Sequence, residues 1–275
     1  MKGLKIIGRL ANKLKRTWRL VTAPLRKSPD FIIIGAQKSG TSSLFTYLEQ
    51  HPDVALSEIK ELHYFDDHYH LGMNKYKRHF PFLWSHKKCG EASPYYFFHP
   101  SVPKRIHQSL KGTKFIVMLR DPVKRAYSHY KHMLRYDGVE ELDFLDALKA
   151  EPERLLGENE KLKAEEIQWS SNHTRFSYTS RGRYAEQINE WLEFFEMDCF
   201  HFIKSESFFK NTFQEMNKVY DFLELEPFTG INLAAQNKGK YEDAPSQEAI
   251  DFIRENLKED QEELIKLLGK EFSWD

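Results

Sequence analysis

The clearest structural signal in the chain is Phe31-Ile-Ile-Ile-Gly35-Ala-Gln-Lys38-Ser-Gly40-Thr41-Ser-Ser-Leu44. Its apolar first half predicts a buried parallel strand that ends in glycine. A loop of glycine and hydroxyl residues follows, and Thr41–Gln50 is predicted to form a helix. Backbone N–H groups at such a helix start bind phosphate, and the helix dipole favours its negative charge. Strand, loop and helix together predict an anion-binding cradle.

The spacing of this loop is close to that of the mononucleotide P-loop, G-x-x-x-x-G-K-[ST], but the lysine is displaced. Gly35 and Gly40 stand in place, whereas Thr41 occupies the lysine position and Lys38 lies inside the loop. Kinases and ATPases use that lysine on the phosphates and the next hydroxyl on Mg²⁺, and no second magnesium motif accompanies the loop. We therefore expect it to hold a 5′-phosphate group without a bound metal. The expected contacts are Lys38, Ser39, Gly40, Thr41, Ser42 and Ser43.

Strands and helices alternate along the rest of the chain. Further buried strands are predicted at Lys114–Arg120 and Asp198–Lys204. Helices are predicted at Val123–Arg135, Phe144–Leu156, Arg183–Phe195, Phe213–Leu223 and Ser246–Leu268. The alternation predicts an α/β fold, a P-loop-like three-layer arrangement with a central, mainly parallel sheet flanked by helices.

The composition is that of an ordinary globular protein. The 275 residues include 40% hydrophobic and 30% charged side chains, which excludes wholesale disorder, collagen and coiled coil. The mean hydropathy is −0.65, and no apolar run is long enough to span a membrane. The two cysteines, Cys89 and Cys199, form neither a disulfide framework nor a metal-binding pattern. We expect two small buried residues, a reducing compartment and no metal.

The first 27 residues differ from the rest of the chain. They contain nine basic and no acidic residues, so the remainder carries a net charge of −9, which argues against nucleic acid as a partner. Their apolar residues lie on one helical stripe, which consists of Leu4, Ile7, Ala11, Leu14, Trp18, Val21 and Leu25. This pattern predicts either a helix on an anionic membrane surface or a helix packed on its own domain or on a partner.

The same segment sets the predicted domain organisation. We expect a basic amphipathic arm at residues 1–29 and a single domain at residues 30–275. The arm lacks the continuous apolar core and the small-residue cleavage pattern of a secretory signal. We therefore expect a cytoplasmic, membrane-peripheral location.

Two motifs in order resemble those of sulfotransferases that use 3′-phosphoadenosine 5′-phosphosulfate (PAPS). Gly35–Leu44 resembles the family's 5′-phosphosulfate loop, and Ile116–Tyr130 is similar to its 3′-phosphate motif. In the second motif, Arg120 and Ser128 match the residues that bind the 3′-phosphate. The resemblance covers about residues 30–245 and implies PAPS as donor and 3′-phosphoadenosine 5′-phosphate (PAP) as product. Lys38 would then stabilise the charge that builds on the departing phosphate.

Ile59-Lys60-Glu61-Leu62-His63-Tyr64-Phe65 resembles a segment of the heparan-sulfate branch whose glutamate is the proposed catalytic base. Glu61 matches that glutamate, and His63 is the alternative, either as the base or as support for the loop. General-base catalysis favours a pKa near the working pH. We expect burial beside Tyr64 and Phe65 to raise the pKa of Glu61, and Lys60 to lower it.

Cys89-Gly-Glu91-Ala92-Ser93-Pro-Tyr95-Tyr96 is similar to a second segment of the same branch. The resemblance implies acceptor contacts for a set of residues from both segments, namely Lys60, Glu91, Ser93 and Tyr95. A buried structural role is the alternative for Glu91. Many heparan-sulfate enzymes have an acceptor-positioning lysine where this chain has Ala92. This difference argues against a heparan-type acceptor but not against the donor.

Two shorter segments resemble parts of the family that lie near the nucleotide. Asn237-Lys238-Gly239-Lys240 resembles a late loop that closes over it. Gly182-Arg183-Tyr184, with Trp191-Leu192, matches a recurrent segment near the cofactor and the core. The resemblance therefore adds four donor contacts, namely Tyr184, Lys238, Gly239 and Lys240.

The combined interpretation is an enzyme that transfers a sulfuryl group in line from PAPS to a hydroxyl or amine, with Glu61 as general base. We expect a carbohydrate or glycolipid acceptor first, and a small phenol or alcohol second. One alternative is a P-loop nucleoside or sugar kinase, which the displaced lysine disfavours. The other is a family member that binds nucleotide without catalysis, which the joint presence of Lys38, Arg120, Ser128 and Glu61 disfavours.

Overall fold

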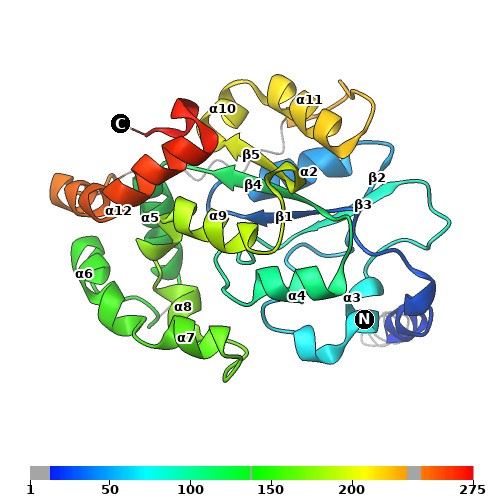
Figure 1. Cartoon of the computed structure of the whole chain (residues 1–275), viewed down its shortest axis with the longest axis horizontal. Helices are drawn as coiled ribbons and strands as arrows, with labels where there is room; N and C mark the ends of the chain where they lie inside the picture. The colour runs from blue at the N-terminus through cyan, green and yellow to red at the C-terminus, as the bar shows by residue number, and fades with distance from the viewer. Residues whose placement is uncertain (1–12, 137, 234–242, 275) are drawn as a thin grey trace, which may run out of the picture.

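The computed structural model describes residues 13–136, 138–233 and 243–274 (Figure 1). Its centre is one sheet with the strand order β2-β3-β1-β4-β5, in which every neighbouring pair is parallel. The strands are β1 Phe31–Gly35, β2 Val54–Leu56, β3 Lys88–Ala92, β4 Lys114–Leu119 and β5 Phe200–Lys204. This arrangement confirms the predicted α/β fold with a central parallel sheet.

Helices connect these strands and cover the sheet. The α-helices are α2 Thr41–Glu49, α3 Met73–Lys77, α4 Val102–Ser109, α5 Pro122–Met133, α6 Phe144–Arg154, α7 Glu158–Lys163, α8 Ser171–Arg175, α9 Tyr184–Leu192, α10 Ser205–Lys210, α11 Thr212–Leu223 and α12 Gln247–Leu268. Short 3₁₀ turns lie at η1 Ala23–Leu25, η2 Tyr69–Leu71, η3 Ser180–Gly182, η4 Met197–Cys199 and η6 Lys270–Phe272. The predicted helices and strands agree with these bounds to within three residues. No sequence pattern predicts β2 or β3, because β2 is three residues long and β3 includes a lysine, a glycine and a glutamate.

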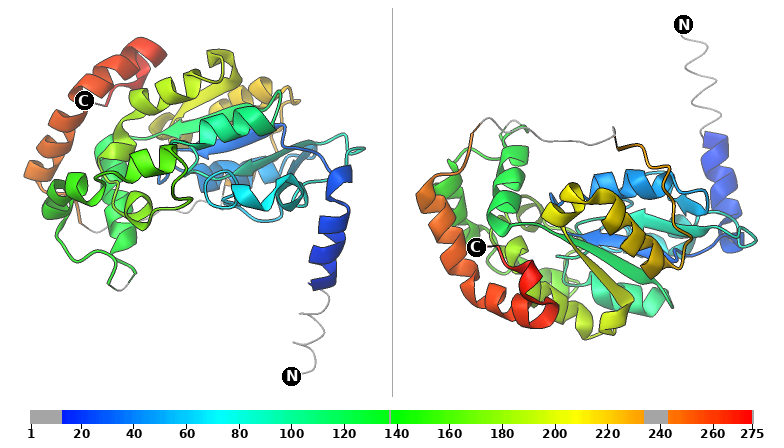
Figure 2. Two further views of the ribbon diagram at one scale, coloured as in Figure 1. Left: turned by 60° about the horizontal axis from the view of Figure 1, so that its bottom comes forward. Right: turned by 90° about the horizontal axis from the view of Figure 1, so that it is seen from above.

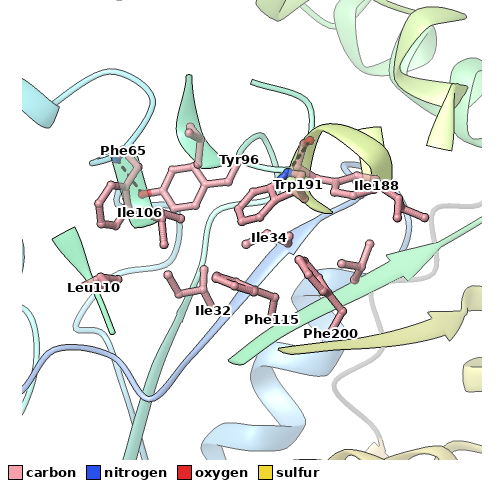
Figure 3. Packing of buried hydrophobic residues seen from close by; sticks show 14 of the residues in the cluster. Ile32, Ile34, Phe65, Tyr96, Ile106, Leu110, Phe115, Ile188, Trp191 and Phe200 are labelled. Carbon is pink, nitrogen blue, oxygen red and sulfur yellow. Dashed lines mark hydrogen bonds between the residues drawn. The ribbon is translucent and has the colours of Figure 1, made fainter. Parts of the chain in front are cut away.

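Alternate residues of the strands point to opposite faces of the sheet. On one face, Ile32 and Ile34 of β1 and Phe115 of β4 pack against Ile106 of α4 and Trp191 of α9 (Figure 3). The end of α12 covers the same face, since Leu264 belongs to the same cluster. All of these side chains are fully or almost fully buried.

The other face is covered by α2, α10 and α11. Ile33 of β1 and Ile116 of β4 pack there against Leu44 and Leu48 of α2 and Tyr220 of α11. The molecule therefore has three layers, helices on both faces of one sheet, as predicted (Figures 1 and 2). A third cluster joins α5, α6 and α12 beyond one edge of the sheet.

The strand order places a topological switch point between β1 and β4. The chain leaves β1 through α2 toward β2, on one side of the sheet, and leaves β4 through α5 toward β5, on the other. In open α/β sheets, ligands bind in the crevice at the carboxyl ends of strands where the connections diverge in this way. The two predicted phosphate motifs follow these two strands, so the fold brings them together.

The described part of the arm packs on the domain through its polar side. Residues 13–21 form a helix, and the chain then enters η1 and a bridge between Arg26 and Phe82. Arg26 is buried and donates to the carbonyl of Phe80, at 2.8 Å. The apolar stripe points outward, since Leu14, Trp18, Val21 and Leu25 are all exposed. The stripe residues Leu4, Ile7 and Ala11 lie outside the described residues.

Two further predictions can be compared with the structure. Cys89 is buried as expected, but Cys199 is only partly buried because it lies at the end of the surface turn η4, so the prediction is wrong for Cys199. Within residues 13–136, 138–233 and 243–274, no helix combines the length and the hydropathy needed to cross a bilayer.

Trp191 links the core to the segment that follows β3. Its indole Nε1 donates to the carbonyl of Phe97, at 3.1 Å (Figure 3). We predict that Trp191→Phe lowers the free energy of unfolding by about 2–4 kcal/mol, because it leaves a void and strands a buried carbonyl. Urea denaturation measures this loss. Trp169→Phe is the control, since Trp169 is 45% exposed, and should change stability by less than about 0.5 kcal/mol. Equal losses in the two variants would contradict the assignment.

Candidate active site

The phosphate loop connects the end of β1 to the start of α2, as predicted. Gly40 immediately precedes α2 with φ 103°, a left-handed conformation that favours glycine. A Cβ there would lie 2.8 Å from the ring of Phe209. At Gly35 a Cβ would lie 2.4 Å from the Cβ of Phe97. Both glycines of the motif are therefore required by the shape of the loop.

The loop is held in place by its neighbours. The amide of Ala36 donates to the carbonyl of Met118 at 2.7 Å, and Arg120 donates through a terminal guanidinium nitrogen to the carbonyl of Lys38 at 2.9 Å. The hydroxyl of Ser205 donates to the carbonyl of Ser39. The Ser39 hydroxyl itself is buried and has no hydrogen-bond partner among the described residues. A buried hydroxyl without a partner is uncommon, and here it lies in the loop predicted to bind an anion.

Lys38 is held in an unusual electrostatic setting. Its backbone is left-handed, with φ 70°, a conformation that costs free energy in a residue with a side chain. The pKa of Lys38 is lowered to about 8, first by burial and then by the positive charge of Arg135, with smaller effects from Arg120 and Arg125. Glu61 opposes this shift. The positive charge of the site thus exceeds what its own acidic groups offset, which favours an anionic ligand.

The second motif starts where β4 ends. Asp121 caps α5 by accepting from the amides of Val123 and Lys124, so the helix begins directly behind Arg120. Tyr184 donates its hydroxyl to the carbonyl of Arg120, at 2.8 Å. Tyr184 is fully buried. In the structure Tyr184 therefore supports the backbone of Arg120, whereas the sequence predicts that Tyr184 contacts the nucleotide of the sulfuryl donor.

The buried face of α5 carries polar side chains. Ser128 is buried there, and Arg125 lies three residues earlier on the same face. Arg125 donates to the carbonyl of Tyr178, while its Nε and its other terminal nitrogen have no partner among the described residues. None of the described carboxylates forms an ion pair with Lys38, Arg120 or Arg125. The sequence assigns Arg125 no role, although its spacing from Ser128 on a helix could have indicated one.

The loop after β2 carries the predicted base. The amide of Glu61 donates to the carbonyl of Ala92 at the end of β3, at 2.8 Å, which brings this loop to the carboxyl edge of the sheet. Glu61 and His63 both have left-handed backbone, with φ 61° and 48°. Two such residues only two positions apart are rare, and strained backbone of this kind concentrates at functional sites.

Glu61 lies in a chain of charged groups. Lys60 Nζ is 2.5 Å from Glu61 Oε1, and His63 Nε2 is 3.7 Å from Glu61 Oε2. The pKa of Glu61 is lowered to about 2, first by His63, against the opposing effect of burial, and further by Lys60. Burial raises this pKa and Lys60 lowers it, as expected, but the sequence does not predict the contribution of His63. The pKa is lowered overall because His63 and Lys60 together outweigh the desolvation.

His63 is held in turn by Asp66. His63 Nδ1 is 2.6 Å from Asp66 Oδ2, and the Asp66 side chain is almost completely buried. Burial alone would lower the pKa of His63, but its contacts with Asp66 and Glu61 raise it to about 10. At neutral pH the ring is thus doubly protonated and orients Glu61. Asp66 is missing from the sequence-based site, although an acid three residues after a histidine could have indicated it.

The third predicted segment lies below the surface. Glu91 is fully buried, and its two carboxylate oxygens accept from Tyr76 and Ser93, both at 2.8 Å. Burial raises the pKa of Glu91 to about 7, against these two hydrogen bonds. Tyr95 is also buried, with its hydroxyl 2.7 Å from His173 Nδ1. The geometry thus fits the structural alternative for Glu91 and gives Ser93 and Tyr95 partners within the protein instead of an open acceptor surface.

Most of the predicted site residues meet at one edge of the sheet. Lys38, Arg120 and Glu61 come together there from the loops after β1, β4 and β2. The predicted loop Asn237–Lys240 lies outside the described residues. Among the described residues, no group of three or more His, Cys, Asp or Glu side chains could hold a metal ion.

Comparison with known proteins identifies the family. The family model for the sulfotransferase domain, which describes the sequences of that family, matches residues 28–265, most of the chain. The chain belongs to the sulfotransferase domain family. A sulfotransferase crystal structure from Alicyclobacillus acidocaldarius is similar, with a TM-score of 0.71, 27% sequence identity, and 88% of this chain and 96% of that chain covered. The fold of this sulfotransferase domain is thus that of a solved relative.

Curated relatives include enzymes of two descriptions. The membrane-associated sulfotransferase kil1 of Dictyostelium discoideum is 26% identical, covering 90% of this chain and 66% of that protein. The human heparan sulfate glucosamine 3-O-sulfotransferase 6 is 32% identical, covering 73% of this chain and 54% of that protein. The sulfotransferase domain described here spans between about half and two thirds of the length of these two relatives.

The residues present fit the donor that the family implies. Three groups without a counterion or partner among the described residues lie around the ends of β1 and β4. They are the Ser39 hydroxyl, the two unpaired guanidinium nitrogens of Arg125, and the Lys38 ammonium, whose pKa is lowered. Each is a donor or a cation that an anion would satisfy. A bis-phosphorylated nucleotide with a sulfuryl group carries charges of that sign.

The electrostatic setting of Lys38 gives a direct prediction. Since only the neutral amine reacts with trinitrobenzenesulfonate, labelling of Lys38 should rise with a midpoint near pH 8. Arg135→Gln should move this midpoint upward, because it removes the strongest repulsion. PAP should also move it upward, because a bound phosphate favours the ammonium. Mass spectrometry of peptides resolves Lys38 from other lysines. A midpoint near 10.5 in the free protein would contradict the described site.

Proposed function

We propose that this protein transfers a sulfuryl group from PAPS to a hydroxyl, or an amine, of a carbohydrate or glycolipid. The observation that carries the proposal is that a carboxylate, Glu61, and a lysine, Lys38, meet at the carboxyl edge of the sheet from the loops after β2 and β1. A proton acceptor beside a phosphate-stabilising cation is the pair of groups that sulfuryl transfer needs. A protein that only binds the nucleotide, without catalysis, needs no proton acceptor at this place.

The donor supplies an activated sulfuryl group on a phosphate leaving group. Different residues contact its different phosphate groups. Arg120 and Ser128 bind the 3′-phosphate, while the amides of the phosphate loop and Lys38 stabilise the negative charge on the departing 5′-phosphate. The sulfur–oxygen bond to the phosphate breaks with its electron pair, and a new bond forms to the acceptor oxygen.

Glu61 accepts the acceptor's proton. A carboxylate with a pKa of about 2 is a weak base toward a free hydroxyl, but the hydroxyl becomes strongly acidic as its oxygen bonds to sulfur. The transfer is therefore favourable late in the reaction. His63 holds the carboxylate in place and, being protonated, cannot itself accept a proton near neutral pH. Lys60 remains a candidate for acceptor contact as well as a partner of Glu61.

The acceptor class rests on the relatives. Heparan sulfate glucosamine 3-O-sulfotransferases act on heparan sulfate, as their name states. The segment with Glu61 resembles one of that branch. Ala92 replaces the lysine of many of those enzymes and is fully buried here. We therefore propose a carbohydrate or glycolipid other than heparan sulfate. Peripheral contact of residues 1–27 with an anionic membrane belongs to the same proposal, supported by the membrane association of kil1.

Donor specificity tests the assignment of the second motif. Arg120→Ala should lower the affinity for PAP by about tenfold to a hundredfold, because a charge-assisted contact to phosphate contributes roughly 1.5–3 kcal/mol. The affinity for adenosine 5′-phosphate, which lacks the 3′-phosphate, should change little. Isothermal titration measures both, and ATP with Mg²⁺ is included to test the kinase alternative. Equal losses for the two nucleotides, or tighter binding of ATP with Mg²⁺ than of PAP, would overturn the donor assignment.

Glu61→Gln tests the base. Transfer of labelled sulfate from PAPS to a panel of glycolipids, oligosaccharides and p-nitrophenol should fall by about 10²–10⁴-fold, with PAP affinity unchanged. The glutamine keeps the size of the side chain but cannot take the proton. If His63 were the base, activity would rise only as pH approaches 10, where the ring loses its second proton. Near-normal turnover in Glu61→Gln, together with such a rise, would assign the role to His63.

A further inference from the structure

An exposed apolar surface spans the arm and a loop of the domain. We call it the arm–loop surface, and it consists of Leu14, Trp18, Val21, Leu25, Leu83 and Trp84. Each of these side chains is between 52% and 72% exposed. The first four lie on the helical stripe of the arm, and the last two lie in the loop between α3 and β3. Large apolar side chains gathered in this way mark interaction sites.

The loop and the arm form one unit. The amide of Leu83 donates to the carbonyl of Leu25, at 2.9 Å. Next to this bond, the Arg26 guanidinium lies 4.1 Å from the ring centre of Phe82, and the rings of Phe82 and Trp84 are stacked 4.4 Å apart. Trp84 is therefore backed by an ordered ring, and the loop is fixed to the end of the arm's stripe.

The arm packs with the reverse of the usual orientation. A surface helix normally buries its apolar stripe and exposes its charges. Here Arg19 donates to the carbonyls of Arg78 and Phe80, and Arg26 donates to that of Phe80, so two guanidinium groups face the domain. The apolar stripe faces away from it. Exposed apolar surface is unfavourable in water, so an apolar partner that covers the stripe from outside would stabilise this orientation.

The charge around the surface selects the partner. Residues 13–27 contain six basic and no acidic residues. Arg26 is buried, and Lys15, Arg19 and Lys27 are paired within the domain, whereas Lys13 and Arg16 form no ion pair with any described residue. Apolar side chains with tryptophan, flanked by free basic groups, are typical of proteins that lie on anionic lipid. We infer that the arm–loop surface docks on an anionic bilayer, with Trp18 and Trp84 both at the headgroup level.

Docking would bring the proposed site to the membrane. Lys15 and Arg19 both pair with Glu58, at 2.8 Å and 3.0 Å, and Glu58 lies three residues before Glu61. The arm thus adjoins the loop that carries the proposed base, and it lies beside α3, far from α6 and α12 (Figures 1 and 2). In this part the inference rests on the proposed function: the acceptor is a saccharide headgroup anchored in the same bilayer.

The test uses the full chain and vesicles of phosphatidylcholine, with and without phosphatidylserine. The wild type should sediment with the anionic vesicles, and less so as salt increases. Trp18→Asp and Trp84→Asp should each reduce the bound fraction at least about tenfold, since each removes a large apolar side chain from the contact. Leu156→Asp is the matched control. Leu156 is 81% exposed and lies in the turn between α6 and α7, and α6 lies at the opposite end of the molecule from the arm (Figure 1). PAP binding should stay unchanged in all variants, which reports on folding.

Each other outcome overturns part of the inference. If Trp18→Asp abolishes binding but Trp84→Asp does not, the arm alone binds lipid and the loop is no part of the surface. If the wild type does not bind, or Leu156→Asp binds as weakly as the tryptophan variants, no docking surface exists here. If sedimentation velocity without lipid shows a dimer that both tryptophan substitutions disrupt, the surface is covered by a second copy of the chain instead of a membrane.

Activity separates this inference from the proposed function. Trp84→Asp should lower sulfate transfer to a glycolipid in anionic vesicles at least about tenfold, but not transfer to the same headgroup as a free glycoside. Loss on both acceptors, or on neither, would overturn the membrane-anchored acceptor. Failure of the wild type to bind PAP would instead count against the proposed function and leave the docking surface intact.

Discussion

The central constraint in this protein is the accumulation of positive charge at the carboxyl ends of β1 and β4. Lys38, Arg120 and Arg125 lie close enough to influence one another, and no described carboxylate pairs with any of them. Charges of one sign repel each other, most strongly where burial reduces the screening by water. Burial is the main cause of the lowered pKa of Lys38, and the nearby cations, first Arg135 and then Arg120 and Arg125, lower it further. An anionic nucleotide would relieve the repulsion, so the same charges that cost stability in the free protein favour the ligand.

The fold supports these cations with neutral groups. Arg120 donates to the carbonyl of Lys38, Arg125 to that of Tyr178, and Tyr184 fixes the backbone of Arg120 from behind. A carbonyl oxygen orients a guanidinium group without cancelling its charge, which a carboxylate would do. The site can therefore be rigid before the ligand arrives and still attract it. Such preorganisation is the main source of electrostatic stabilisation in enzymes.

The acidic part of the site follows a different principle. Glu61 and Asp66 flank the protonated His63, so the carboxylate of Glu61 is ionised and fixed in orientation. Its loop is fastened to β3 through the carbonyl of Ala92 and to the arm through Glu58. The arm, the loop that carries Glu61 and the sheet are thus joined by direct hydrogen bonds and ion pairs.

The strand, loop and helix of residues 31–50, the helix after Arg120 and the parallel sheet could all be predicted from the amino-acid sequence, because apolar periodicity and glycine spacing are local signals. The sign of the pKa shift at Glu61 could not be predicted in this way, since it depends on where the folded chain places His63 and Lys60 relative to one carboxylate. The tertiary structure also determines that Glu91, Ser93 and Tyr95 are buried and that the apolar stripe of the arm faces outward. Charge and burial are sums over neighbours that come from distant parts of the chain, and no local pattern records which of them will meet.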